Sequence, residues 1–495
     1  MDSIDRLRIT PVFCTAIAAA AGYYILFKLA FAVIVSVLLL AVTALCFFRV
    51  ISSFNFGIKF LNSGSERGLQ ITFVRAAAFT AGLALGLCAA DAGKNEVNLG
   101  MDSGKVTAVE GALLEDPRVI ASGSAMASLS LKKCSGAGGL RVSGSGEITV
   151  FFPRESAEKL KQYGRGAVIF AEGTLRSSPQ GWSFSARSLH ITKKAPLLER
   201  TRTGIRLNLS DRFNGGDWSA LSLALLLGIR DNLDSGFTAQ YRDAGLSYIL
   251  ALSGMHLAII AALIAFFLKK TLGLKASAVT GSIFIIFYCL LVGPMPSLNR
   301  SAFMYIIGVI TILGFFPKRS ISVLSISFII QIIVSPASGN SLSFILSYIA
   351  LLGILITSRS LSFLLAGVIP DFILQPLSLS CGAFLATAGI CGFTFGVIAP
   401  IGIIAGLFIV PLTAAFMAGS LLWLLLDIFS VSGVLSPALS IVYRVMESIA
   451  SAAGHVPGIH ANPVLVLVIS LSISILLVFL EFRRRNALYQ LQPFN

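Results

Sequence analysis

Residues 248–267 read YILALSGMHLAIIAALIAFF, a stretch that is apolar except for a small cluster near its start. Its length matches the roughly 20 apolar residues that a helix needs to cross the hydrocarbon of a bilayer. The cluster consists of Ser253, Gly254 and His256. Polar and ionisable side chains are costly in hydrocarbon, so they often mark a functional pathway. The stretch therefore predicts a membrane helix that carries a candidate site.

The composition of the whole chain favours lipid as its solvent. Of 495 residues, 56% are hydrophobic and 12% are charged, and the mean hydropathy is +0.86. Soluble domains have roughly 25% charged residues. We expect a polytopic α-helical membrane protein of about 11 to 12 transmembrane helices. The candidate spans lie near residues 11–27, 31–48, 71–90, 245–268, 276–293, 301–316, 320–335, 343–357, 380–398, 401–426, 436–453 and 463–481.

Residues 91–218 have a different character, because glycine, serine, charges and alternating segments replace the apolar runs. Period-2 alternation and turn residues predict strands in KVTAVEGALL, MASLSLKKC, GEITVFFP, AVIFAEGTL and WSFSARSLHI. Five short strands suggest an inserted small β-barrel of the OB type, with another small β-domain as the alternative. The predicted domains are membrane segments at 1–90, the β-domain at 91–218, a membrane bundle at 219–482 and a basic tail at 483–495.

Basic residues in short loops predict the orientation, since Lys and Arg stay on the cytoplasmic side. Lys269, Lys270 and Lys275 follow the span at 245–268, and residues 483–485 read Arg-Arg-Arg after the last span. With these loops inside, we expect both termini in the cytoplasm and the β-domain outside. The predicted location is the cytoplasmic (inner) membrane of a bacterium, crossed many times.

No catalytic motif stands out in the sequence. It contains neither a G-x-x-x-x-G-K-[ST] phosphate loop nor H-E-x-x-H. Its four histidines are scattered, and six of its seven cysteines fall in or beside apolar spans. Neither metal-ligand spacing nor a disulfide framework can be built from them. We therefore expect no enzyme activity, no cofactor and no metal.

The predicted external domain is mildly basic, with 18 Lys and Arg against 13 Asp and Glu in residues 91–218. Such a barrel can follow a phosphate backbone, with aromatic side chains stacking on bases. The alternative is a β-domain that is only soluble. The candidate nucleic-acid-binding residues are Lys132, Lys133, Arg141, Arg165, Arg176 and Arg187.

Several polar residues of the bundle have two interpretations. Ser253, Gly254 and His256 could line a wet cavity or simply pack helices. Arg300, at the outer end of a span, could snorkel or bind phosphate. Polar stripes can line a path, although interhelical hydrogen bonds explain them as well. The candidate path residues are Ser253, Gly254, His256, Arg300, Ser327, Gln331, Phe344 and Ser347.

Four segments resemble one known family. They read LALLLGIRDNL, FTAQYRDAGLSYILALSGMHLAII, SLNRSAFM and LSFILSYIALLGIL, and they are similar to the competence domain of the ComEC family over roughly residues 70–430. By that resemblance Ser253, Gly254, His256 and Arg300 occupy motif positions, and Phe344, Leu346 and Ser347 fit a later one. Near Pro411 the family often has an asparagine where this chain has Gly406, so a polar contact proposed there is not transferred.

The resemblance implies an inner-membrane channel for uptake of single-stranded DNA in natural transformation. Many family members continue into a metallo-β-lactamase-like domain, whereas this chain ends at Asn495 after its last span, so we expect the form without that domain and transfer no nuclease role. The implied partners are single-stranded DNA, an external DNA receptor and a separate nuclease. Because the sequence has no phosphate loop, we expect the force to come from a cytoplasmic helicase-type ATPase or from the proton gradient. Membrane lipids and a second copy of the chain are further expected partners.

Two other functions remain open from the sequence. The first is a non-enzymatic transporter or envelope assembly protein for another polyanion or a lipid-linked substrate, with the β-domain as a docking module. The second is a membrane hydrolase, which requires a metal or nucleophile site that the sequence does not reveal.

Overall fold

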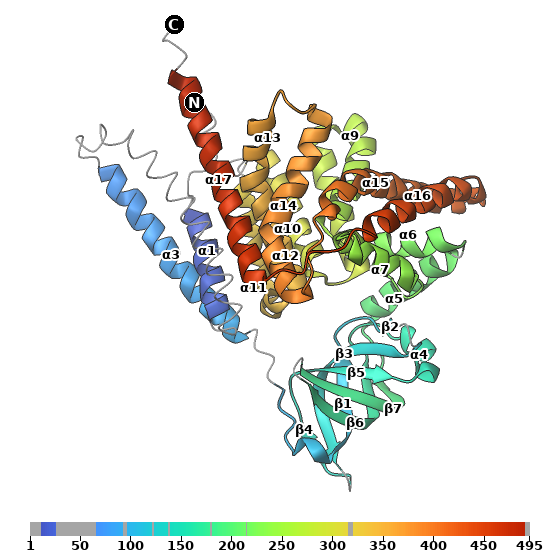
Figure 1. Cartoon of the computed structure of the whole chain (residues 1–495). Coiled ribbons are helices and arrows are strands. Elements are labelled where there is room, and N and C mark those ends of the chain that lie inside the picture. The colour runs from blue at the N-terminus through green and yellow to red at the C-terminus, as the bar shows by residue number, and fades with distance from the viewer. Residues whose placement is uncertain are drawn as a thin grey trace.

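The structure is a computed structural model that describes residues 11–25, 66–92, 97–120, 123–136, 139–178, 181–213, 215–314 and 320–490. The predicted span at 31–48 lies outside these residues. A large helical bundle carries a β-domain at one of its ends, and the last helix, α17 (Pro463–Gln490), ends on the opposite side (Figure 1).

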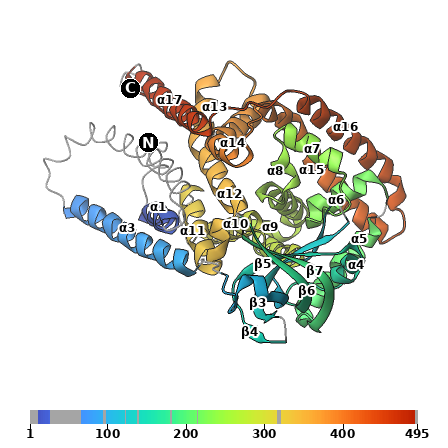
Figure 2. The same cartoon turned by 60° about the horizontal axis from the view of Figure 1, so that its bottom comes forward.

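Two N-terminal helices pack side by side at the edge of the bundle (Figure 2). They are α1 (Pro11–Ile25) and α3 (Glu66–Ala92). Gly82 and Gly86 lie directly against the α1 backbone at Thr15 and Ala19, so a Cβ on either glycine would clash with it. Small residues allow this approach, which is how helices commonly associate in membranes. Tyr24 fastens α1 to the bundle by donating to the carbonyl of Gly339 at 2.9 Å.

The β-domain is a seven-stranded sheet. Its strands are β1 (Val106–Leu113), β2 (Arg118–Val119), β3 (Ala125–Gly136), β4 (Arg141–Ser143), β5 (Glu147–Phe152), β6 (Val168–Ser178) and β7 (Gly181–Lys193). They pair in the order β1-β6-β7-β5-β3-β2, while β4 pairs with β3, and β1 also pairs with β3. The β5–β7 pairing is parallel and the others are antiparallel. All five predicted strands are confirmed, and the short β2 and β4 are additional.

Alternation along the strands forms the core of this domain. Phe152, Phe184 and Leu129 point inward and are almost fully buried. Helix α4 (Arg154–Lys161) adds Ala157 and Leu160 to the same cluster. The β-domain therefore has its own hydrophobic core, separate from that of the bundle.

Four helices follow the sheet, namely α5 (Leu197–Arg212), α6 (Asp217–Leu227), α7 (Ser235–Asp243) and α8 (Ser247–Leu250). Residues 197–212, at the end of the predicted β-domain, are thus helical. Helix α6 is buried along most of its length, and its Trp218 packs edge-on against Trp423 with ring centroids 5.3 Å apart. It belongs to the bundle core, as expected for an apolar segment too short to span a bilayer.

Helix α9 (Gly254–Val292) is a hairpin of two helical segments. Gly273 interrupts it with a φ of 74°, a left-handed conformation that glycine adopts readily. The two segments pack together, since Ile264 lies 3.9 Å from the Cβ position of Gly281, and Leu257, Ile285 and Val292 share one cluster. The two predicted spans at 245–268 and 276–293 correspond to these segments, although the first begins at residue 254.

The rest of the bundle consists of α10 (Pro296–Ile312), α11 (Ser320–Val334), η3 (Pro336–Asn340), α12 (Leu342–Gly353), the π-helical η4 (Ile354–Ser358), α13 (Arg359–Leu365), α14 (Asp371–Phe395), α15 (Ile401–Asp427), η5 (Ser432–Val434), α16 (Ser436–Gly454) and α17. Helices α14 and α17 pack closely at Gly389, where Leu467 occupies the space that a Cβ would need.

Within the described residues, five helices are long and apolar enough to cross a membrane. They are Gly254–Val292, Leu342–Leu365, Asp371–Phe395, Ile401–Asp427 and Pro463–Arg484. Shorter apolar helices lie at Val12–Tyr24, Ala77–Ala90, Asp217–Leu227 and Ser320–Val334. This is the pattern of a multi-pass membrane protein with a β-sheet domain, although length and hydropathy select fewer spans than the predicted 11 to 12. Cys88, Cys134, Cys289, Cys381 and Cys391 are free thiols.

Candidate functional site

The Ser253-Gly254-x-His256 element forms the start of α9. Ser253 is the N-cap with extended backbone, and its N–H donates to Nδ1 of His256 at 3.1 Å. The Ser253 hydroxyl lies 3.0 Å from the same nitrogen. Because a backbone N–H can only donate, Nδ1 is an acceptor and a neutral ring carries its proton on Nε2. Nε2 is buried and has no hydrogen-bond partner in the described part of the chain.

Gly254 brings this element into contact with Arg300 on α10. A Cβ at Gly254 would lie 2.8 Å from Nη2 of Arg300 and 2.5 Å from the hydroxyl of Ser301. Only a residue without a side chain leaves room for the guanidinium there. Gly254 and His256 are two residues apart, or about 200° around a helix, so the imidazole points to another side of α9. The structure thus places Gly254, but not His256, against Arg300.

Arg300 is a buried cation, with 8% of its surface exposed. Its Nε donates to the Ser347 hydroxyl at 2.8 Å, and Nη1 lies 3.4 Å from the sulfur of Met304. The guanidinium carbon is 5.8 Å from the centre of the Tyr348 ring, within cation–π range. No carboxylate of the described residues forms an ion pair with it. Arg300 does not snorkel to the surface, and its charge has no counter-ion among the residues that the structure describes.

A closed hydrogen-bond network lies beneath Arg300 and joins α10, α11 and α12. The Ser327 hydroxyl donates to the Arg300 carbonyl at 3.2 Å and lies 3.0 Å from the Tyr348 hydroxyl. Tyr348 donates to Oε1 of Gln331 at 2.9 Å, and Nε2 of Gln331 donates to the Pro296 carbonyl at 2.8 Å. Ser327 and Gln331 have their polar groups satisfied by neighbouring helices, as expected for polar residues that hold helices together.

Phe344 belongs to an aromatic cluster behind this network. It is 1% exposed, and its ring centroid lies 4.7 Å from that of Tyr348 and 5.6 Å from that of Phe328. Ser347 and Phe344 therefore occupy different surroundings on α12, because Ser347 touches Arg300 whereas Phe344 fills the core. Of the eight candidate path residues, Gly254, Ser327 and Ser347 contact Arg300, and Ser253 contacts His256.

The six basic candidates of the β-domain are all exposed, but they fall into separate groups. Lys132, Lys133 and Arg141 lie together, because β4 pairs with β3 next to Lys133. Figure 1 shows β4 at the end of the domain away from the bundle. Arg176 and Arg187 lie on the β6–β7 hairpin. Arg165 lies in the turn before β6, whose Gly166 approaches Pro196 at the start of α5.

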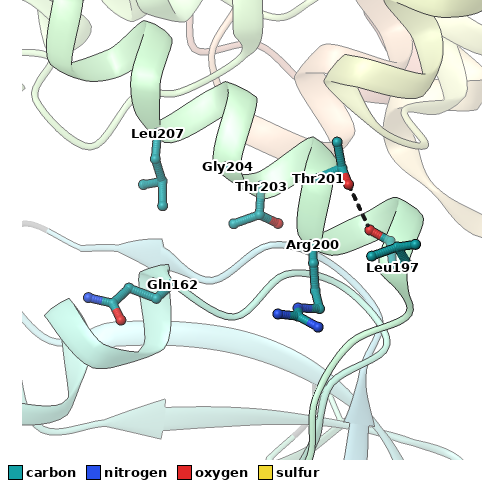
Figure 3. A pocket seen from close by; sticks show the side chains of 7 residues that line it. All are labelled: Gln162, Leu197, Arg200, Thr201, Thr203, Gly204 and Leu207. Carbon is teal, nitrogen blue, oxygen red and sulfur yellow. Dashed lines mark hydrogen bonds between the residues drawn. The ribbon is translucent and has the colours of Figure 1, made fainter.

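No group of three or more His, Cys, Asp or Glu side chains among the described residues could hold a metal ion. An open pocket of about 340 Å³ lies between the end of α4 and α5 (Figure 3). It is lined by Gln162, Leu197, Arg200, Thr201, Thr203, Gly204 and Leu207, and by none of the predicted site residues.

The sequence interpretation missed four residues that the structure brings into polar contacts, namely Ser301, Tyr348, Arg202 and Arg206. Ser301 and Tyr348 are neighbours in sequence of Arg300 and Ser347, and could have been found by extending those motifs by one residue. Arg202 and Arg206 on α5 are one helical turn apart, and Arg202 is buried. Their spacing was visible in the sequence, but nothing in it showed that they face protein.

Comparisons with known proteins fit this arrangement. Neither a search of curated proteins nor a search of solved structures gives a match. The family model described as "Competence protein" matches residues 225–485, which include α9, Arg300 and the α10–α12 network but not the β-domain. Because that match covers more than half of the chain, the protein belongs to the competence protein family.

Proposed function

We propose that this chain forms an inner-membrane channel for the uptake of single-stranded DNA in natural transformation. The observation that carries the proposal is the setting of Arg300. Its guanidinium is buried, has no carboxylate partner in the described part of the chain, and lies at the N-terminus of α9 beside Gly254. A helix N-terminus carries roughly half a positive charge. Two positive groups therefore face each other in a buried place.

Such an arrangement favours a bound anion. A buried charge without a partner is destabilising by several kcal/mol, roughly 3 to 5 in measured cases. An anion between Arg300 and the helix start would offset that cost, and both groups are common phosphate ligands. A phosphodiester strand supplies such anions one after another. Few basic side chains lie within the described membrane-spanning segments, which suits transport, because a translocated chain must also be released.

The connectivity of the β-domain supports an OB-like interpretation. Strands β1, β3, β5, β7 and β6 pair in a ring that returns to β1, with the parallel pair at β5–β7 and α4 between β5 and β6. Five-stranded Greek-key barrels of the OB type bind single strands with basic and aromatic side chains, and we propose the same use for this β-domain. Phe151 is 36% exposed on β5, whereas Phe152 and Phe184 are core residues. We propose that Phe151 and the exposed basic residues receive the strand.

We infer the orientation of the chain in the membrane from the basic residues at the turn of the α9 hairpin. Lys269, Lys270 and Lys275 are exposed beside the Gly273 turn of α9. Figure 1 shows α9 reaching the end of the bundle away from the β-domain. Basic loops remain cytoplasmic. We therefore propose that the hairpin turn and both termini lie inside, and the β-domain outside, the cytoplasmic membrane of a bacterium.

The proposed role is not enzymatic, and transport requires other proteins. We propose a cytoplasmic helicase-type ATPase as the source of force, an external receptor that delivers DNA and a separate nuclease that removes one strand. Membrane lipids surround the bundle, and a second copy of the chain is a further proposed partner.

The experiment is DNA uptake by cells that carry Arg300→Gln in place of the wild-type chain. We expect uptake to fall roughly 10- to 100-fold, the equivalent of losing a charge-assisted interaction of about 1.5 to 3 kcal/mol. The matched control is Arg444→Gln, because Arg444 is exposed on α16. If Arg300→Gln reaches the membrane at the wild-type level and imports DNA at the wild-type rate, the proposal is wrong. An envelope defect with normal DNA uptake would favour transport of another polyanion.

A further inference from the structure

Two arginines of α5 join the ends of two bundle helices. Nε of Arg202 donates to the Leu291 carbonyl at 3.1 Å, and its Nη2 donates to the Val292 carbonyl at 3.2 Å. Nη1 of Arg206 donates to the Leu227 carbonyl at 3.0 Å and to that of Val292 at 3.1 Å. Carbonyls at a helix C-terminus lack partners within the helix and carry partial negative charge, so arginine suits them.

Asp116, in the loop between β1 and β2, ties the β-domain to this point. Its carboxylate accepts hydrogen bonds from Nη1 of Arg202 at 3.2 Å and from Nη2 of the same residue. Nε of Arg206 lies 3.4 Å from the same carboxylate. Glu199 also pairs with Arg202 at 2.6 Å. Burial lowers the pKa of the Arg202 guanidinium, but Asp116 and Glu199 outweigh it and the pKa is raised.

A second contact reinforces the first on the turn after α6. Asp231 accepts a hydrogen bond from the Val119 N–H at 3.4 Å and lies 3.9 Å from Nζ of Lys161. Val119 is on β2 and Lys161 is at the end of α4. The β-domain is thus held to the bundle at Asp116 and again at Asp231, and each contact is charged.

Both contacts lie at the end of the bundle that contains the Arg300 site. The hairpin of α9 returns Val292 to the level of its start, where the Ser297 hydroxyl donates to the Leu252 carbonyl at 2.6 Å. Gly293, at φ 101°, leaves space for the Arg202 guanidinium, which lies 2.7 Å from its Cβ position. Three residues after Gly293, Pro296 begins α10, and its carbonyl accepts a hydrogen bond from Nε2 of Gln331.

We propose that Asp116, Arg202 and Arg206 are positioning residues that hold the β-domain over the connection between α9 and α10, so that a captured strand is delivered toward Arg300. This rests on the proposed function. Asp116 has a more direct link to α10 than Asp231 has. Its carboxylate contacts both Arg202 and Arg206, and these arginines bind the carbonyls of the residues that precede α10. The positioning role predicts that loss of the Asp116 charge loosens the β-domain while the helix caps remain.

The test uses the full chain in lipid nanodiscs with spin labels at Thr174 in the β-domain and Lys275 at the hairpin turn, both exposed. Distances between the labels are compared for the wild type and Asp116→Asn, which keeps the shape but removes the charge. The matched control is Glu115→Gln, because Glu115 pairs with Arg118 inside the β-domain at 2.8 Å. We expect a broader distance distribution in Asp116→Asn alone, and partial recovery in Asp116→Glu.

Two further readouts separate positioning from a merely structural role. Asp116→Asn is expected to reduce DNA uptake roughly tenfold while the full chain binds a fluorescent single strand as tightly as the wild type. An unchanged distance distribution overturns the proposal, and so does a broadened one with normal uptake. If the wild-type chain supports no DNA uptake, the proposed function is wrong. The distance distributions still test whether Asp116 holds the β-domain in place.

Discussion

Gly254 lies directly against Arg300, with its Cβ position 2.8 Å from Nη2 of the guanidinium. Gly254 has no side chain, whereas Arg300 has a long cationic one. The missing side chain at position 254 is what leaves room for the guanidinium. Gly254 allows the helix start to approach the charge, and Arg300 gives that helix start a cation where an anion is normally preferred. The contact joins two sequence motifs about 46 residues apart, as two adjacent helices in a bundle can.

Gly254→Ala should therefore act through Arg300. The added methyl group overpacks the contact, so we expect a loss of stability of about 1 to 3 kcal/mol and lower DNA uptake. Thermal unfolding in nanodiscs and an uptake assay measure the two effects. Gly308→Ala on α10 is the control, since a Cβ there meets nothing within 4 Å. Equal melting temperatures for Gly254→Ala and the wild type would contradict the close contact.

Tyr348→Phe tests whether the network beneath Arg300 packs helices or conducts the strand. The substitution removes the hydroxyl that donates to Gln331 but keeps the ring beside Arg300. We expect a loss of about 0.5 to 1.5 kcal/mol in unfolding and uptake within twofold of the wild type. Tyr305→Phe serves as control, because the Tyr305 hydroxyl makes no hydrogen bond within the described residues. A severe uptake defect with normal stability would instead indicate a path along these side chains.

Salt dependence tests the basic group at the far end of the β-domain. Each phosphate contact to a single strand contributes about 0.7 to the slope of log affinity against log salt. Replacing Lys132, Lys133 and Arg141 by Ala in the full chain should lower that slope by about 2. The charge-matched control replaces three exposed lysines elsewhere, namely Lys159, Lys193 and Lys194. Equal slopes for both triple variants would show that the charge of the domain matters but not this group.

Cys134 provides a pH-dependent test of the β-domain core. The side chain is fully buried, and burial raises the pKa of its thiol. Since the thiolate is the reactive form, its fraction at any given pH falls as the pKa rises. In a chain with Cys134 as its only cysteine, we expect slow maleimide labelling at pH 7 to 8 that accelerates as the pH increases or the domain unfolds. Lys133→Cys in a cysteine-free chain is the exposed control, and similar labelling rates at the two positions would contradict the buried core.

The strands and most helices were predictable because they depend on local patterns. The period-2 alternation of β3 and β5 matches their buried and exposed faces, except at Lys132 and Lys133, which are both exposed where the β1–β3 register shifts. The short β2 and β4 were missed because two or three residues carry no period. The count of spans was less predictable, since the chain mixes long helices with apolar stretches such as α6 that are buried by protein rather than by lipid.

The candidate site was only partly predictable, and Ser327 shows why. Its polarity and helical spacing fitted both a wet path and helix packing, and its contacts with Arg300 and Tyr348 support packing. Phe344 fitted a motif, yet its surroundings are those of a core residue. Residue type alone does not say which neighbour a side chain meets.

Hydropathy and alternation along the chain were enough to establish a membrane bundle with an inserted β-domain, because burial in lipid or in a sheet repeats at short, regular intervals. The contacts of Gly254 with Arg300 and of Asp116 with Arg202 required the folded chain. They depend on the turn of the α9 hairpin at Gly273, which brings Val292 back beside Leu252. Contacts between residues so far apart in the sequence produce no periodic pattern in it.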